Sequence, residues 1–504
     1  MTSDPDFAEL RSGEGQPSKL LIGGRWCSAS DGRRFAVEDP ASGRLLCEAV
    51  DASPADALAA LDAAVAAQRD WARTAPRERA EILRRAFDRL TADREIFASI
   101  IAQETGKPLG EARGEVAYAA EFLRWFSEEA VRVQGRYQTA PDGKHRHLVS
   151  RKPVGPCLLV TPWNFPLAMV ARKIAPAVAA GCTMVVKPSE LTPATAARFA
   201  VLMSEAGLPA GVLNLVPTMR AEAVIAALLA DPRLRKLSFT GSTRVGRLLL
   251  AATAANVQRS SLELGGNAPF LVFEDADLDA AIEGAMQAKL RNAGQACTAA
   301  NRFLVHDAIA DEFVSRLGRA FEAVEGKDRT DAIGPLISRR ARDHVHALIG
   351  DALARGARLV TGGKLPEGAG YFYPPTLLAD VAPGSRLLEE EIFGPVAPVQ
   401  RFASDAEAVG AANATPYGLA AYAYTTDLDR VLRLQDELDA GMLGINSGLV
   451  SDPAAPFGGV KHSGLGREGG SEGIEEYLSI HYAAIGRGRR RSRDRIPDFA
   501  TAAA

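Results

Sequence analysis

The chain has 504 residues, of which 47% are hydrophobic and 24% charged, and its formal net charge is −3. This length and composition are typical of a water-soluble protein with two or three domains. The near-neutral charge argues against nucleic-acid binding, the lack of a membrane-length apolar run argues against a membrane protein, and the lack of a secretory leader pattern argues against secretion. We therefore expect a cytoplasmic protein.

The first third of the chain combines short strands, helices and an arm. Residues 1–18 are expected to be a disordered N-terminus, and turn residues between apolar runs over 20–49 predict a few strands. The sequence Ser53-Pro54-Ala55-Asp56 is typical of a helix start, with a Ser cap, a Pro in the first turn and an acid three residues after the cap. Helical patterns continue to about Gly110 and again over 111–133, and residues 135–153 favour an extended arm or hairpin.

From Val154 the pattern alternates between strand and helix. Apolar strand patterns occupy 154–160, 183–186, 212–216, 236–239 and 261–264, and helical patterns occupy 167–179, 193–205, 222–230 and 243–255. This alternation predicts a mostly parallel α/β sheet of the dinucleotide-binding type. A second α/β region follows from Ala268 to about Gly464, and residues 491–504 are expected to be a basic, flexible tail.

The most informative cysteine is Cys297, in the loop Gly294-Gln295-Ala296-Cys297-Thr298. Small neighbours leave room for a substrate at the sulfur, and a backbone N–H beside the thiol is suited to hold an oxyanion, so Cys297 is a candidate nucleophile. An ordinary buried cysteine is the alternative interpretation of this segment alone. The five cysteines are odd in number and have no spacing typical of disulfides or of a metal site, which favours a reducing compartment and no bound metal.

One loop favours phosphate binding. The segment Phe239-Thr240-Gly241-Ser242 follows a strand pattern and opens a helix, where a capped N-terminus and a Gly that permits close approach favour an anion. The literal G-x-G-x-x-G at 464–469 lacks the strand–turn–helix context of a nucleotide fingerprint, so we interpret it as a structural turn.

Four further polar residues stand at three predicted strand ends. Asn164 follows the first strand of the sheet and is a candidate donor to an oxyanion, while Lys187 and Glu190 follow the second and are candidates for binding ribose hydroxyls. Glu263 lies at an apolar strand end, where burial raises a carboxyl pKa and suits it to act as a general base. Solvent-exposed turn residues are the alternative for each.

Together these segments resemble the aldehyde dehydrogenase superfamily, and the likeness extends from about Leu20 to Ala484. The motifs occur in order: TPWNFP at 161–166, KPSE at 187–190, FTGST at 239–243, LELGGN at 262–267, GQAC at 294–297 and EIFGP at 391–395. Within the superfamily, Arg291 and the stretch PFGGVKHSGLGREGG at 456–470 are most similar to succinate-semialdehyde dehydrogenases that use NAD or NADP.

The resemblance implies a division of roles. Cys297 would attack the aldehyde, Asn164 and the Cys297 backbone N–H would hold the oxyanion, and Glu263 would activate the water that hydrolyses the thioester. The residues implied in cofactor binding are Thr161, Pro162, Trp163, Asn164, Lys187, Ser189, Glu190, Phe239, Gly241, Ser242, Val245, Leu264, Glu391 and Phe393. Relatives that pass the acyl group to coenzyme A typically lack a Glu at position 263, so a free carboxylic acid is the expected product.

Substrate choice is expected to depend on Arg172 and Arg291, with Ser451 assisting. In semialdehyde-specific relatives the matching positions hold the substrate carboxylate, because a guanidinium pairs with a carboxylate through two hydrogen bonds. Either arginine could instead form a structural ion pair. Glutarate semialdehyde or a neutral aldehyde is the alternative substrate, and a non-redox cysteine hydrolase or a silent structural protein is a more remote alternative.

The Glu190 carboxylate would repel a 2′-phosphate, which favours NAD, although NADP remains possible. Two departures from the family pattern concern neighbouring sites. The loop Pro217-Thr218-Met219-Arg220 stands where relatives carry a Gly, and Ala299 replaces a second cysteine found in some succinate-semialdehyde enzymes.

The expected fold class is therefore α/β and aldehyde dehydrogenase-like. Residues 19–134 and 154–265 would form a Rossmann-type NAD(P)-binding domain and residues 266–472 a catalytic domain. Residues 135–153 and 473–490 would form a small oligomerisation element, which predicts a homodimer or homotetramer.

Overall fold

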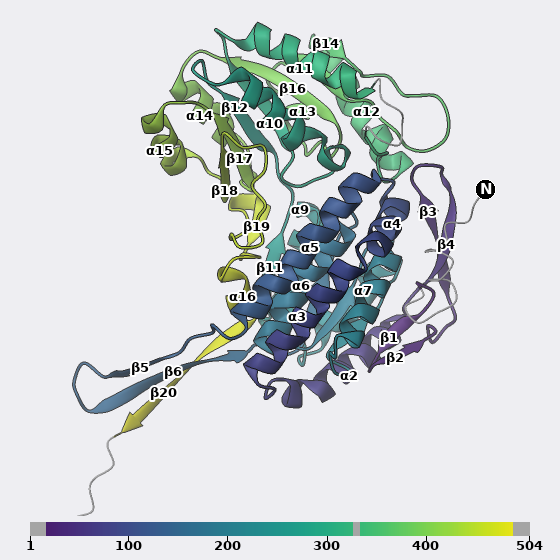
Figure 1. Ribbon diagram of the computed structural model, residues 1–504, viewed down its shortest axis with the longest axis vertical. Coiled ribbons are helices and arrows are strands. Elements are labelled where there is room, and N and C mark those ends of the chain that lie inside the picture. Colours follow the sequence, from purple (N-terminus) through teal and green to yellow (C-terminus); the bar gives the residue numbers. More distant parts are fainter. Residues whose placement is uncertain (1–16, 326–332, 487–504) are drawn as a thin grey trace, which may run out of the picture.

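Two sheets, each covered by helices, organise the chain in the computed structural model, which describes residues 17–325 and 333–486 (Figure 1). The sheets form two lobes, and a narrow three-stranded arm projects from the lobe that contains the N-terminal half (Figure 1). The α/β class expected from the sequence is confirmed. The expected tail over 491–504 and nearly all of the expected disordered N-terminus lie outside the described residues.

From residue 17, where the described structure begins, the N-terminal region contains four short strands and four helices. The capping box predicted at Ser53 is present, because Asp56 N donates to Ser53 Oγ at 3.1 Å and Ser53 N donates to the Asp56 carboxylate at 2.8 Å. The elements are β1 (Leu20–Ile22), β2 (Arg25–Cys27), β3 (Arg34–Asp39), β4 (Arg44–Val50), α2 (Pro54–Trp71), α3 (Pro76–Ala92), α4 (Arg94–Thr105) and α5 (Leu109–Glu129).

An eight-stranded sheet follows, and its strand order is β19-β11-β10-β7-β8-β9-β1-β2. Its elements after the arm are β7 (Cys157–Val160), α6 (Pro166–Ala180), β8 (Met184–Lys187), α7 (Pro193–Glu205), β9 (Leu213–Leu215), α8 (Ala221–Ala230), β10 (Lys236–Thr240), α9 (Thr243–Thr253), the 3₁₀ turn η1 (Ala254–Asn256) and β11 (Arg259–Glu263). Strands β7 to β11 are parallel, as the strand–helix alternation predicted.

The order of this sheet creates a switch point. From β7 the chain proceeds through β8 and β9 in one direction and then returns to place β10 on the other side of β7. Loops after strands on opposite sides of such a point diverge and leave a crevice, where open α/β sheets bind ligands. The loops that follow β7 and β10 are the segments that the sequence singled out at 161–166 and 241–243.

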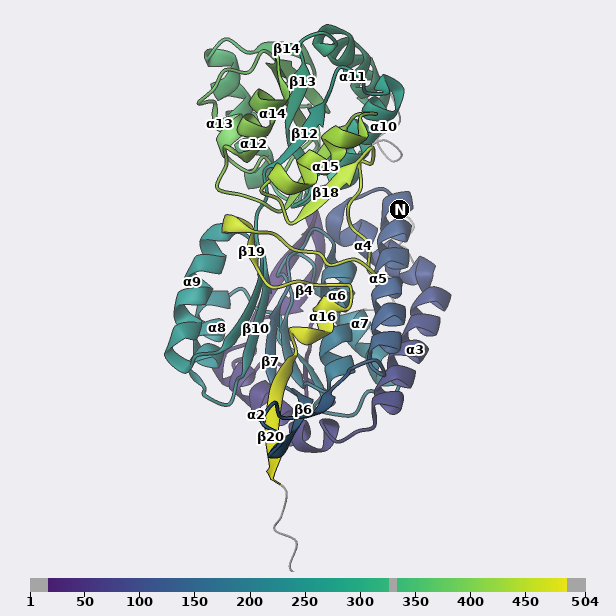
Figure 2. The ribbon, with the colours of Figure 1, turned by 90° about the vertical axis from the view of Figure 1, so that its left-hand side faces the viewer.

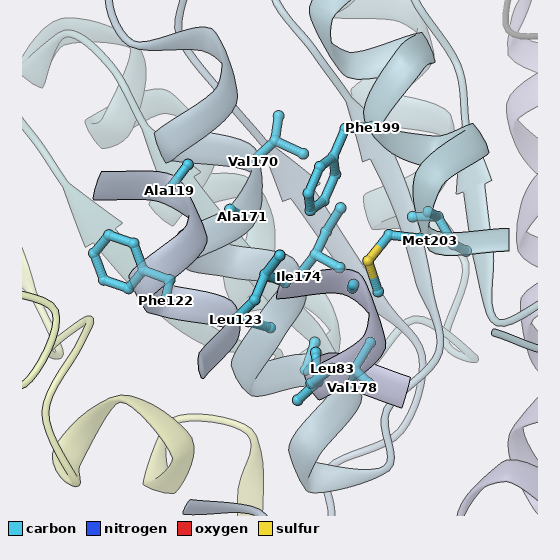
Figure 3. Packing of buried hydrophobic residues seen from close by; sticks show 14 of the residues in the cluster. Leu83, Ala119, Phe122, Leu123, Val170, Ala171, Ile174, Val178, Phe199 and Met203 are labelled. Atoms are coloured by element: carbon cyan, nitrogen blue, oxygen red, sulfur yellow. The ribbon is translucent and has the colours of Figure 1, made fainter. Parts of the chain in front are cut away.

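Helices cover both faces of this sheet (Figure 2). On one face α3, α5, α6 and α7 pack through side chains that include Leu83, Phe122, Ile174 and Phe199 (Figure 3), and α2, α8 and α9 lie on the other. Every residue of α6 is buried, including Arg172 and Lys173. Burying two adjacent cations is costly unless an anion neutralises them, so this helix needs a partner that its own sequence does not supply.

The second sheet has seven strands in the order β14-β15-β16-β13-β12-β17-β18, all parallel to their neighbours except β14. Its elements are β12 (Ala268–Val272), α10 (Leu278–Leu290), the 3₁₀ turn η2 (Arg291–Gly294), β13 (Ala300–His306), α11 (Ala310–Glu325), α12 (Arg339–Ala354), β14 (Arg358–Thr361), β15 (Thr376–Ala379), α13 (Arg386–Glu389), β16 (Val396–Phe402), α14 (Asp405–Asn413), β17 (Ala420–Tyr424), α15 (Leu428–Glu437) and β18 (Met442–Ile445).

The chain then returns to the first lobe. After η3 (Lys461–Ser463), strand β19 (Gly464–Leu465) pairs with β11, and α16 (Glu472–Glu475) leads into β20 (Leu478–Gly486). A Cβ at Gly464 would overlap the carbonyl oxygen of Leu262, which explains why this G-x-G-x-x-G segment needs its first glycine. Strands β5 (Arg136–Thr139) and β6 (His145–Pro153) form a hairpin, and β20 pairs with β6 along its whole length.

Among the described residues, no helix combines the length and apolar content needed to cross a lipid bilayer.

Candidate active site

A cavity of about 260 Å³ lies where the two lobes meet, at the carboxyl ends of β7, β10 and β11. The turn that carries Cys297 closes it from the second lobe. Thirteen residues singled out from the sequence line this cavity: Pro162, Trp163, Asn164, Arg172, Gly241, Ser242, Glu263, Leu264, Arg291, Cys297, Glu391, Phe393 and Ser451. The remaining six, Thr161, Lys187, Ser189, Glu190, Phe239 and Val245, do not line it.

Cys297 follows a strained turn. Asn292 and Ala293 both have φ near +53°, and Gly294 has φ +73°, so three successive residues adopt the left-handed conformation. Left-handed non-glycine residues are costly and persist where surrounding contacts fix them. A Cβ at Gly294 would overlap the carbonyl of Gly394, so only glycine fits there. The turn thus brings the thiol to the cavity wall.

The resting thiol is neutral. Burial raises the pKa of Cys297 to about 12, and although Arg172 opposes this rise, the carboxylates of Glu391 and Glu263 reinforce it. The thiolate is the nucleophilic form of cysteine. Cys297 therefore needs a base, or a nearby positive charge, before it can attack a carbonyl.

Asn164 lies opposite this turn and is 6% exposed. Its side-chain amide donates from Nδ2 to the carbonyl oxygen of Gln295 at 3.0 Å, and its Oδ1 is buried without a hydrogen-bond partner in the described structure. The amide carries a second hydrogen, which is available to a ligand in the cavity. This arrangement can stabilise negative charge on an oxygen bound beside Cys297.

Glu263 ends strand β11 and is 2% exposed, with both carboxyl oxygens lacking a hydrogen-bond partner in the described structure. Burial raises the pKa of Glu263 well above its ordinary value, and the charge of Glu468 raises it further, whereas Arg172 and Lys173 partly oppose the shift. A carboxyl group held in this way is a titratable acid–base group rather than a permanent anion.

Glu468 is the anion that α6 required. Its carboxylate lies 2.5 Å from Arg172 Nε and 2.5 Å from Lys173 Nζ, and all three side chains are almost fully buried. Burial alone would raise the pKa of Glu468, but the two cations outweigh burial and hold it below its ordinary value. Arg172, a candidate for the substrate carboxylate, is therefore already partly neutralised by an internal carboxylate.

Four polar side chains converge at the far end of the cavity. Arg172 and Arg291 both line it, and the Tyr118 phenol faces Arg172 and the Ser451 hydroxyl. Aromatic rings support the two guanidinium groups, with Phe457 4.1 Å from Arg172 and Phe165 5.1 Å from Arg291. Such a set of donors is suited to a small anion at the end of a bound molecule.

Gly241 and Ser242, at the start of helix α9, also line the cavity. Ser242 caps helix α9 by accepting a hydrogen bond from Val245 N at 3.4 Å, and a Cβ at Gly241 would lie 2.5 Å from the ring of Phe239, so a residue without a side chain lets that ring pack at the helix start. Such an N-terminus favours phosphate. The rings of Trp163 and Phe393 meet edge to face at 5.5 Å, and both residues line the same cavity.

Two polar pairs involve residues proposed from the sequence for cofactor binding: Glu391 with the Gly266 backbone N–H, and Lys187 with Glu190. Glu391 accepts a hydrogen bond from Gly266 N at 3.1 Å, and burial raises the pKa of Glu391 to about 7. Lys187 and Glu190 contact each other at 2.9 Å rather than the cavity. Although burial opposes the shift, Lys187 holds the pKa of Glu190 below its ordinary value, so this pair presents one cation and one anion.

Sequence reasoning missed Tyr118, Phe165, Phe457, Lys173 and Glu468. One signal was available, since adjacent cations in the apolar helical stretch 167–179 imply a buried anion. The anion itself lies almost 300 residues further along the chain, in a glycine-rich stretch whose sequence indicates a turn and a family likeness but assigns no role to Glu468. Tyr118, on helix α5, had no local sequence signal.

Comparison with known proteins agrees with this geometry. Residues 26–482 match the model of the aldehyde dehydrogenase family. A succinate-semialdehyde dehydrogenase of Paenarthrobacter nicotinovorans is 60% identical over 444 residues, which cover 88% of this chain and 99% of the relative. A glutarate-semialdehyde dehydrogenase of Pseudomonas aeruginosa is 46% identical, with 93% and 97% covered. The crystal structure of an Escherichia coli NADP-dependent enzyme has a TM-score of 0.91 at 46% identity, with 93% and 98% covered.

The chain therefore belongs to the aldehyde dehydrogenase family. It is an NAD(P)-dependent enzyme, and the resemblance inferred from the six ordered motifs is confirmed.

Proposed function

We propose that the enzyme oxidises succinate semialdehyde to succinate, with Cys297 as nucleophile, Asn164 as oxyanion donor and Glu263 as the base that activates water. The observation that carries this proposal is one cavity that holds a thiol, two arginines and a carboxyl group with no hydrogen-bond partner among the described residues. The 60% identity to a succinate-semialdehyde dehydrogenase supports it.

The first half of the reaction makes the aldehyde able to lose hydride. The thiol of Cys297 loses its proton to solvent water, its sulfur adds as a thiolate to the carbonyl carbon, and the resulting oxyanion accepts hydrogen bonds from Asn164 Nδ2 and the Cys297 backbone N–H. The negative oxygen of the tetrahedral adduct re-forms a carbonyl as hydride leaves the carbon. The product is a thioester on the sulfur of Cys297. The dinucleotide, when bound, supplies the hydride acceptor.

The second half releases the acid. Glu263 in its ionised form takes a proton from water, and the hydroxide attacks the thioester carbonyl. The C–S bond breaks, and the departing thiolate takes the proton from Glu263 to return the thiol of Cys297. The high pKa of Glu263 makes this carboxylate a strong base once it is ionised. Hydrolysis rather than acyl transfer gives a free carboxylic acid.

Arg172, Arg291 and Ser451 are proposed to hold the terminal carboxylate of the substrate. Arg172 shares its charge with Glu468, whereas Arg291 is supported by the ring of Phe165. We therefore assign the larger share of anion recognition to Arg291. A longer semialdehyde such as glutarate semialdehyde is the second candidate substrate, which the 46% identical relative favours.

NAD is the proposed preferred cofactor, and NADP is the alternative. The Thr161–Asn164 loop, Ser189, Leu264 and the Glu391–Phe393 pair would contact it, with Lys187 and Glu190 at the ribose. Glu190 is ionised beside Lys187, and its charge would repel a 2′-phosphate. The NADP-dependent E. coli neighbour keeps the alternative open.

A homodimer or homotetramer is proposed, assembled through strands β5, β6 and β20. The arm projects from its lobe and exposes apolar side chains, among them Tyr137, Ile480 and Tyr482, which favour burial against another subunit. The five cysteines, none in a disulfide, favour a reducing compartment such as the cytoplasm.

One assay tests the proposed function. Purified protein is mixed with NAD or NADP and with succinate semialdehyde, glutarate semialdehyde or butanal, and reduced cofactor is followed by absorbance. We expect kcat/KM to be highest for succinate semialdehyde with NAD. Equal kcat/KM for butanal would refute the proposed substrate class, and turnover without reduced cofactor would point to a hydrolase.

A further inference from the structure

Behind Asn164 lies a buried lysine that the reaction above does not use. Lys107 stands between α4 and α5, and its side chain is 2% exposed. Its ammonium donates to the Glu115 carboxylate at 2.7 Å and to the main-chain carbonyl oxygen of Asn164 at 2.9 Å. It also lies 4.5 Å from the centre of the Phe165 ring.

A second donor reaches the same carbonyl from the Cys297 turn. Asn292 Nδ2 donates to Asn164 O at 2.9 Å and to Gln295 O at 3.1 Å. A carbonyl oxygen has two lone pairs, so Lys107 and Asn292 together saturate that of Asn164. Asn164 Nδ2 also donates to Gln295 O. Asn164 is therefore joined to the turn before Cys297 through both its side-chain amide and its main-chain carbonyl.

The lysine is itself held by the framework. Glu115, on α5, accepts from the backbone N–H groups of Leu167 and Ala168 at the start of α6, at 2.9 and 3.3 Å. The Glu115 carboxylate therefore contacts both the start of helix α6 and the Lys107 ammonium that holds the Asn164 carbonyl. The turn is held from α5 as well, because Asn292 N donates to Glu111 at 2.8 Å.

We propose that Lys107 and Asn292 are positioning residues for the oxyanion donor. By holding the Asn164 carbonyl they set the plane of the loop, so that one amide hydrogen of Asn164 meets Gln295 and the other points at the oxygen formed beside Cys297. This inference rests on the proposed role of Asn164. A displacement of about 1 Å in a group that stabilises a transition state typically costs about a hundredfold in rate.

The test combines single and double variants of the full-length enzyme, with kcat and KM measured for succinate semialdehyde. We expect Lys107→Met to lower kcat by about tenfold to a hundredfold, with KM changed by less than about threefold, because the substrate carboxylate binds elsewhere. In an Asn164→Ala background the same change should cost less than about threefold, since residues that act through one group are not additive.

Lys236→Met is the matched control. Lys236 is also fully buried, lies 3.6 Å from a carboxylate of Glu476 and 5.0 Å from the Tyr477 ring, but stands at the opposite end of β10. We expect it to leave kcat per folded protein within about twofold of wild type, with folded protein quantified by thermal unfolding. A loss of kcat equal to that of Lys107→Met would overturn the proposal.

A second variant keeps the test decisive if Lys107→Met does not fold. Asn292→Gly retains a residue that tolerates φ +53° and removes the second donor, and we expect about a tenfold loss of kcat. Full kcat in this variant, or losses in Lys107→Met that multiply fully with Asn164→Ala, would refute the positioning role. Wild-type kcat in Asn164→Ala alone would instead refute the proposed oxyanion donor, and with it this inference.

Discussion

The two ends of strands β10 and β11 both hold buried polar side chains, but these side chains have partners at one end and lack them at the other in the described structure. Toward the amino ends, Lys236 contacts the Ser261 hydroxyl, the Glu476 carboxylate and the Tyr477 ring. At the carboxyl ends, the Thr240 hydroxyl and both oxygens of Glu263 have no hydrogen-bond partner in the part of the chain that the structure describes. Buried polar groups are normally partnered, so the unpartnered end is the one prepared for ligands.

Two carboxyl groups show how this difference arises. Glu468 lies between Arg172 and Lys173 and is held ionised, whereas Glu263 is buried near Glu468 and has no ion pair with any cation of residues 17–325 and 333–486. The first is a fixed charge that keeps α6 in place, and the second is a group whose proton can move. Burial alone therefore does not define an acid–base residue, because the distribution of neighbouring cations decides its state.

The largest effect is expected from replacing the cysteine in the cavity, compared with replacing a cysteine at the amino end of the sheet. Cys297→Ala should lower aldehyde oxidation by roughly 10⁴-fold or more, because the covalent route is lost. The matched change Cys157→Ala removes a fully buried thiol at the amino end of β7 and should leave kcat per folded protein within about twofold. Steady-state rates of both variants measure this contrast, and similar losses in the two would contradict it.

Anion recognition provides the next test. Arg291→Met should lower kcat/KM for succinate semialdehyde by about a hundredfold while leaving that for butanal within about threefold, since a guanidinium–carboxylate pair in a closed site contributes up to ~3 kcal/mol. Butanal serves as the internal control for correct folding of the site. An equal loss for both aldehydes would show that Arg291 is structural.

The titration of Glu263 predicts a pH dependence. Its pKa is raised, so the carboxylate needed to activate water is scarce below that pKa and accumulates above it. Where hydrolysis limits turnover, kcat should therefore rise by up to ~tenfold per pH unit on the acid side. Glu263→Gln should flatten this limb, and an unchanged pH profile in that variant would assign the limb to another group.

The smallest expected effect is on stability. A carboxyl pKa raised by folding means that the native state binds the proton more tightly, so stability from this group is lost as pH rises through its folded pKa. Glu263→Gln should remove that loss and raise Tm at pH 8 more than at pH 5, with ~1 °C for each kcal/mol recovered in a chain of this length. A Tm that falls equally at both pH values would argue against a buried, unpartnered Glu263.

Local patterns predicted much of this molecule because local forces determine those parts. The Ser53 capping box, the alternating strands and helices of 154–263 and the hairpin over 135–153 all form where the sequence placed them. The candidate site residues at strand ends were also visible, because parallel strands bring their carboxyl ends to one edge.

What the sequence could not supply are contacts between distant segments. The partner of Arg172 and Lys173 is Glu468, and the donors to the Asn164 carbonyl are Lys107 and Asn292. Nor does a motif reveal that the Cys297 thiol is neutral in the free protein, because its pKa depends on desolvation and on charges from both lobes.

The central claim, that an acyl group forms on Cys297 and leaves through water activated by Glu263, is tested most directly by rapid mixing of Glu263→Gln with NAD and succinate semialdehyde. The account predicts a fast burst of about one reduced cofactor per subunit, followed by steady turnover slowed by ~10²-fold or more, because the thioester accumulates. A steady rate equal to that of wild type, with no burst, would contradict it.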